Sequence, residues 1–158
     1  PDGLMLIHVE LAGDQTEGVE SIILSSTLPS SKLWSHEQKR LISFMPADEQ
    51  RAIETAARTG NFDAPEYIKA NDDYTRLHAG EVTESSPECI RRKKRFGTES
   101  YIEAWGPNEY TPTGTLKDFD YTDKLGNISV RALIISGTND ECTPLIAKTM
   151  FDRIPNSE

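Results

Sequence analysis

The chain has 158 residues and a mass of 17.7 kDa, the size of one domain, yet only 36% of it is hydrophobic and its mean hydropathy is -0.54. The sequence has 26 acidic and 17 basic residues, and the resulting net charge of -9 argues against a nucleic acid or an anionic membrane surface as partner. A cationic substrate fits this charge better, and no apolar run approaches the roughly 18 residues of a membrane span.

The first part of the chain predicts half of an α/β unit. Residues 3–12 are apolar almost all round, which is typical of a helix buried on most sides. After a polar turn, residues 19–26 predict a short strand that is buried along its whole length.

Residues 28–114 then change to polar and charged helix-forming sequence, which predicts an inserted helical subdomain. Ser35 and Gln38 have the spacing of a capping box, so a helix is expected to start there. Pro46 starts a second helix, which Gly60 closes.

Two more helices are expected in the same insertion. Residues 65–78 predict the first of these and residues 87–96 the second. The second contains the basic run 91–95, which we interpret as a solvated helix face rather than a localisation signal.

The pattern returns to α/β after the insertion. Residues 116–125 form a short amphipathic stretch, and residues 130–136 predict a second buried strand. A polar loop follows, and Pro144 stands at the first turn of a helix over 145–154.

Two strands alone do not make a stable open parallel sheet, because each needs neighbours on both edges and helices over both faces. The fold class is therefore α/β, seen in part: a core segment over 1–27, a helical cap over 28–114 and a second core segment over 115–158. The alternative is a complete helical protein with one two-stranded sheet.

Asp140 lies directly after the second predicted strand, and Glu141 adds a second carboxylate. In open α/β sheets, ligands and catalytic groups collect at the carboxyl ends of the strands. From the spacing alone this pair has three possible tasks: to orient a catalytic histidine, to bind a cation, or to cap the following helix.

A family resemblance enters with residues 105–115, a segment dense in glycine, proline and aromatic residues around the single acid Glu109. This segment, together with residues 116–125, 133–144 and 21–34, resembles the proline iminopeptidases. These are prolyl aminopeptidases of the α/β-hydrolase superfamily, and the likeness is closest to the tricorn-interacting aminopeptidase branch. It covers nearly the whole chain.

The resemblance implies roles for individual residues. Asp140 matches the acid of a Ser-Asp-His triad, which would hold the histidine in its productive tautomer. Glu109 and Glu141 match two glutamates that grip the free N-terminal amine of the substrate. Tyr101 and Trp105 match positions near the pocket for the first residue, although ordinary packing within the cap is an equal alternative for each.

The sequence also departs from the family pattern. It contains no Gly-x-Ser-x-Gly elbow, and aligning residues 3–5 with the stretch after the nucleophile places Pro1 where the serine should stand. The chain ends before the position expected for the catalytic histidine. We interpret His8, His36 and His78 as packing or surface residues.

Three hypotheses about function remain. The chain is the central part of a serine aminopeptidase that releases N-terminal proline or another small residue; or it is an inactive truncated remnant that docks to a partner; or the same fold acts as an esterase, amidase or epoxide hydrolase. The expected partner is a peptide with a free N-terminus, and the oligomeric state stays open.

No cofactor and no metal are expected. Cys89 and Cys142 have neither the number of a disulfide framework nor the spacing of a metal site. We interpret them as free thiols in a reducing compartment, which favours a cytoplasmic location.

Overall fold

The computed structural model describes residues 18–80, 83–87 and 97–158. The predicted helix over 3–12, most of that over 87–96, and Cys89 lie outside the described residues. Within the described ranges, no helix is long and apolar enough to cross a membrane.

Contacts divide the chain into two compact units. Of the described residues, the first unit holds 18–38 and 116–158, and the second holds the remainder of 39–115. The division predicted from the sequence places the first boundary eleven residues earlier, whereas here the start of α2 (Ser31–Ile42) belongs to the first unit. The assignment of the units as core and cap stays a prediction.

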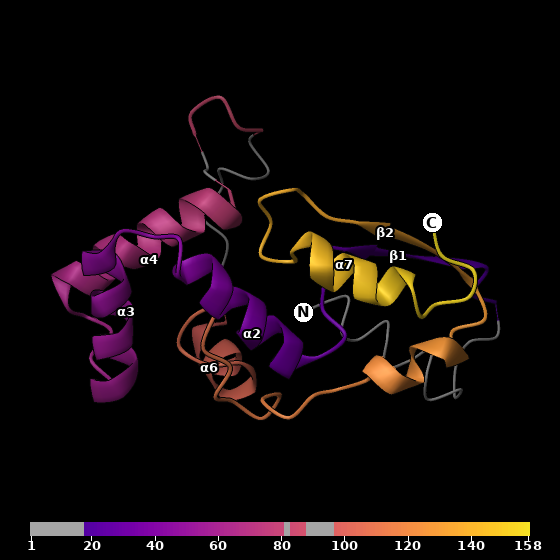
Figure 1. The fold of residues 1–158 in the computed structure, drawn as a ribbon, viewed down its shortest axis with the longest axis horizontal. Coiled ribbons are helices and arrows are strands. Elements are labelled where there is room, and N and C mark those ends of the chain that lie inside the picture. The colour runs from indigo at the N-terminus through magenta and orange to yellow at the C-terminus, as the bar shows by residue number, and fades with distance from the viewer. Residues whose placement is uncertain (1–17, 81–82, 88–96) are drawn as a thin grey trace. The chain divides into compact units, whose positions relative to one another are not determined.

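A two-stranded parallel sheet organises the first unit. Strand β1 (Ser21–Ser25) pairs with β2 (Arg131–Ile135), with Ser21 opposite Arg131 at one end and Ser25 opposite Ile135 at the other. Helix α7 (Pro144–Phe151) packs against β2, and a 3-10 helix, η1 (Thr122–Asn127), packs against α7 (Figure 1).

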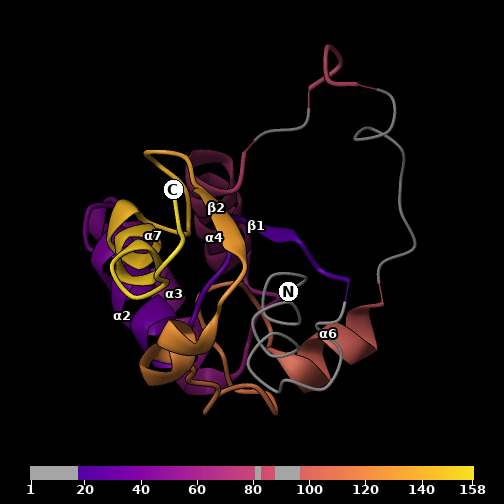
Figure 2. The ribbon, with the colours of Figure 1, turned by 90° about the vertical axis from the view of Figure 1, so that its right-hand side faces the viewer.

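The edge of β2 that lies away from β1 is paired with the last residues of the sequence. Ala132 N donates to Asn156 O at 3.0 Å, Glu158 N donates to Ala132 O at 3.0 Å, and Ile134 N donates to Glu158 O at 2.8 Å. The bridge between Ala132 and Ser157 is parallel. The last residues therefore run beside β2, as both ribbon views show (Figures 1 and 2).

The prediction that the first strand is buried along its whole length is wrong, and the second strand is also only partly buried. Leu24 is fully buried, but its neighbour Ile23 is 58% exposed, and Leu133 and Ile135 are exposed on β2. Successive side chains of a strand point to opposite faces. Leu24 and Ala132 therefore lie on the buried face of the two strands, and Ile23, Leu133 and Ile135 lie on the exposed one.

The start of α2 is also different from the prediction. The helix begins at Ser31, and Ser30 Oγ accepts a hydrogen bond from Leu33 N at 3.3 Å, which is the N-cap arrangement. Ser35 lies inside the helix, where its Oγ donates to Ser31 O at 2.9 Å. The capping box predicted for Ser35 is therefore wrong.

The second unit contains the helices predicted from Pro46 and over 65–78, and both are confirmed. Helix α3 (Ala47–Thr59) follows Pro46 and ends at Gly60, whose φ of 73° is left-handed and suits glycine. Helix α4 (Pro65–His78) starts with its proline at the first position. A short helix, α6 (Thr98–Ala104), was not expected from the sequence.

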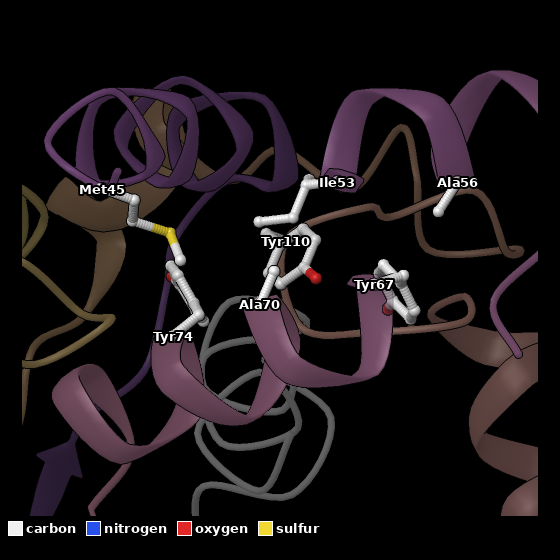
Figure 3. Close-up of a cluster of buried hydrophobic side chains, with 7 residues drawn as sticks. All are labelled: Met45, Ile53, Ala56, Tyr67, Ala70, Tyr74 and Tyr110. Carbon is white, nitrogen blue, oxygen red and sulfur yellow. The ribbon is translucent and has the colours of Figure 1, made fainter. Parts of the chain in front are cut away.

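A cluster of buried side chains holds the second unit together (Figure 3). Tyrosine rings pack edge to face in it, with the ring centroids of Tyr74 and Tyr110 separated by 4.8 Å. The cluster consists of Met45, Ile53, Ala56, Tyr67, Ala70, Tyr74 and Tyr110.

The burial pattern of β1 can be tested with adjacent residues. Leu24→Ala should lower the free energy of unfolding by about 2–5 kcal/mol, because it empties a fully buried position. Ile23→Ala, the matched control on the exposed face, should cost about 0.5 kcal/mol or less. Urea unfolding of the two variants measures the difference, and equal losses would show that both faces of β1 are covered.

Candidate functional site

The five residues singled out from the sequence fall in both units. Asp140 and Glu141 belong to the first unit; Tyr101, Trp105 and Glu109 belong to the second.

Asp140 lies in the loop after β2, and donors hold both of its carboxylate oxygens. Oδ2 accepts from Ser26 Oγ at 2.6 Å and from Gly137 N at 3.3 Å. Oδ1 accepts from Cys142 N at 2.7 Å. Hydrogen bonds to an ionised acceptor are stronger than neutral ones. The half-buried carboxylate is thus oriented while part of it stays open to solvent.

Ser26 was missed by the sequence analysis. It follows β1 with a φ of 48°, a left-handed value that a residue other than glycine rarely adopts, and such residues gather at functional sites. Its amide donates to Ile135 O at 2.9 Å, so the end of one strand supplies the hydroxyl and the end of the next supplies the acid. In the sequence Ser26 is only the last residue of the predicted strand 19–26, and no local pattern indicates its partner Asp140.

The loop that carries Glu141 is fastened to α2. Gln38 Nε2 donates to Glu141 O at 2.9 Å, and Thr143 Oγ1 donates to Glu37 Oε2 at 2.6 Å. Glu37 and Gln38 are fully buried, and Glu141 is only 9% exposed. Buried polar groups that are hydrogen-bonded give a loop one defined conformation.

The capping alternative for the two acids is wrong. Thr143 is the N-cap of α7, and its side chain accepts from Ile146 N at 3.5 Å. Pro144 occupies the first position of the helix, as predicted. For the cation alternative, no cluster of three or more His, Cys, Asp or Glu side chains able to hold a metal occurs among the described residues.

Cys142 is buried beside the acid. Burial raises the pKa of its thiol to about 12, the charge of Asp140 adds to this, and a backbone hydrogen bond with Thr27 offsets part of it. Since the thiolate is the reactive form, burial and the raised pKa both disfavour attack by this cysteine near neutral pH.

In the second unit, glycines allow residues 105–115 to fold back tightly on the end of α6. Thr113 N and Gly114 N both donate to Trp105 O at 2.8 Å. Gly106 has a φ of 145°, and a Cβ there would lie 2.4 Å from Thr111 O. A Cβ at Gly114 would lie 2.5 Å from the carbonyl carbon of Ala104, so larger residues would disrupt the turn.

Glu109 lies half-buried in this turn between two buried residues, Asn108 and Tyr110. Trp105 Nε1 donates to Glu109 O at 3.2 Å, so the indole holds the backbone of the turn. Trp105 itself is buried, and Tyr101 is half-buried on α6. The carboxylate is thus carried on a backbone that is held from both sides.

Comparisons with known proteins show what this chain is similar to. No family model matches the chain. It is 53% identical over 156 residues to a proline iminopeptidase of Lactobacillus helveticus, covering 99% of this chain and 53% of the relative. It is 52% identical over 157 residues to the proline iminopeptidase of Levilactobacillus brevis, covering 99% of this chain and 52% of that relative. The chain spans about half the length of the curated relatives it matches.

Two solved structures have a similar fold. The crystal structure of VinJ superimposes with a TM-score of 0.86 at 24% identity, covering 99% of this chain and 53% of that one. The crystal structure of the proline iminopeptidase of Mycobacterium smegmatis gives a TM-score of 0.80 at 26% identity, and the match covers 99% of this chain and 52% of that one.

The fold is therefore part of an α/β-hydrolase fold, as predicted. Within that class the chain is homologous to the corresponding part of the proline iminopeptidases, and the family resemblance carried by its motifs is confirmed. The likeness to the tricorn-interacting branch and the roles of the five site residues stay predictions.

The burial of Cys142 predicts slow thiol chemistry. In a Cys89→Ser variant, which leaves Cys142 as the one cysteine of the sequence, Ellman's reagent should react very slowly at pH 8, because the thiolate is scarce and shielded. The rate should rise about tenfold per pH unit up to about pH 11 while the protein stays folded. Fast reaction at pH 8 without urea would contradict the buried position.

Proposed function

We propose that this chain is the central part of a serine aminopeptidase that releases N-terminal proline or another small residue from peptides. The observation that carries the proposal is 53% identity to a proline iminopeptidase over 99% of the chain, with an acid held at the carboxyl end of β2. The serine and histidine of the triad would come from other parts of a longer protein.

Asp140 would act as the acid of the triad. Its carboxylate would accept a hydrogen bond from Nδ1–H of the histidine, hold the productive tautomer and stabilise the imidazolium as the serine loses its proton. The hydrogen bonds from Ser26 and Cys142 support this role, since they leave the carboxylate one orientation.

Glu109 and Glu141 would bind the free amine of the substrate. An α-ammonium or a prolyl iminium is a small cation whose donors two converging carboxylates can satisfy. An internal peptide nitrogen carries no charge, so it gains nothing from this site and is rejected. The net charge of -9 supports a cationic ligand.

Tyr101 and Trp105 would lie near the pocket for the first side chain. Aromatic rings offer the flat apolar surface that a pyrrolidine ring or another small side chain packs against. Their positions just before the turn that carries Glu109 support this. A cytoplasmic location likewise stays a prediction.

Two substitutions in the full-length protein test the assignment. Asp140→Asn should lower kcat for prolyl-β-naphthylamide by about 10⁴-fold, because the histidine loses its orienting acid. Glu109→Gln should lower kcat/KM by about 10- to 100-fold, the size of a lost charge-assisted hydrogen bond. Release of naphthylamine measures both.

Glu103→Gln is the matched control: it also removes a glutamate charge, six residues earlier on exposed α6, and should leave activity within twofold. Full activity in Asp140→Asn and Glu109→Gln would overturn the assignment. Equal turnover of an amide without a free amine would favour the esterase or amidase hypothesis, and no turnover at all would favour the remnant.

A further inference from the structure

Glu109 stands between two residues whose side chains are bound to α4. Asn108 Nδ2 donates to Tyr67 Oη at 3.0 Å, and Tyr110 Oη donates to Asn71 Oδ1 at 3.0 Å. Tyr67 and Asn71 lie four residues apart on one face of α4, and Tyr67 Oη donates to Asn71 Oδ1 at 3.5 Å. Figure 3 shows Tyr67 and Tyr110 in the buried cluster.

The connections close into a ring. Asn108 Oδ1 accepts from Tyr110 N at 3.2 Å, which links the two residues across Glu109. Hydrogen bonds thus connect Asn108 to Tyr67, Tyr67 to Asn71, Asn71 to Tyr110, and Tyr110 back to Asn108. The backbone of Glu109 is held on each side, and its own carbonyl is bound by Trp105.

Packing alone does not require such a ring. The cluster around it already contains apolar side chains such as Met45 and Ile53, and apolar residues would fill the same space without needing partners. A polar network that is fully satisfied in the interior makes the structure rigid and specifies one geometry. What this network specifies is the position of the turn that carries Glu109.

We propose that Tyr67 and Asn71 are positioning residues for recognition of the substrate's amine. Acting through Asn108 and Tyr110, they hold the backbone of Glu109 so that its carboxylate meets the cationic amine. They touch no substrate atom themselves. This inference rests on the proposed aminopeptidase function, and it extends the binding site for the amine into α4.

Removing single hydroxyls tests the inference in the full-length protein. Tyr110→Phe deletes the donor to Asn71. Tyr67→Phe deletes the acceptor for Asn108 together with the longer hydrogen bond to Asn71. Both variants keep the packed aromatic side chain. Each variant should raise KM for prolyl-β-naphthylamide about fivefold, the usual worth of one hydrogen bond, with kcat within twofold. Hydrolysis of p-nitrophenyl acetate, a neutral ester without an amine, should stay within twofold.

Tyr74→Phe is the matched control. Tyr74 is fully buried in the same cluster and on the same helix, but the hydrogen bonds of Asn71 and Asn108 remain in its phenylalanine variant. Its KM should be within twofold of the parent protein. If Tyr67→Phe or Tyr110→Phe fails to fold, the other variant carries the test.

A double-mutant cycle separates positioning from general support of the fold. In a Glu109→Gln background, where the carboxylate is already gone, Tyr110→Phe should no longer change KM. An unchanged KM in both single variants, equal losses on the prolyl and the ester substrates, or a persistent effect in Glu109→Gln would overturn the inference.

Failure of the proposed function gives a different pattern. If the parent protein hydrolyses the ester but not the prolyl substrate, or if Glu109→Gln leaves KM unchanged, the amine site itself is wrong. That result would overturn the proposed function and this inference with it.

Discussion

The parallel pairing of β1 with β2 is the interaction on which the first unit depends. Parallel neighbours present their carboxyl ends at the same edge of the sheet, so the residues that follow the two strands meet there. Ser26 follows β1 and Asp140 follows β2, and the hydroxyl of one donates to the carboxylate of the other. A shift in register would separate the two groups and leave the acid with fewer donors.

Each unit then uses helix side chains to hold the loop that carries an acid. In the first unit, Gln38 of α2 binds the backbone of Glu141, and in the second unit Asn71 of α4 binds Tyr110 beside Glu109. In both cases the polar contacts are to the loop's backbone or to a neighbour of the acid. The scaffold therefore defines where the backbone carries each acid.

Local signals in the sequence predicted much of the fold. Pro46 marks the start of α3 and Gly60 its end, because proline suits the start of a helix and glycine readily adopts the left-handed conformation that ends one. The start of α2 was wrong because several serines precede it and each is a good N-cap, so spacing alone could not choose Ser30. The roles of Ser26 and Asn71 were not predictable, since each depends on a partner that is distant along the chain and close only after folding.

The connection between the paired strands also has a consequence for synthesis on the ribosome. About 105 residues separate the end of β1 from the start of β2. At roughly 5–20 residues per second, β1 leaves the ribosome roughly 5 to 20 s before its partner. The second unit is compact within residues 39–115, so its internal contacts can form during the delay. During this delay nascent β1 has no partner strand, so Leu24 is exposed to non-native contacts.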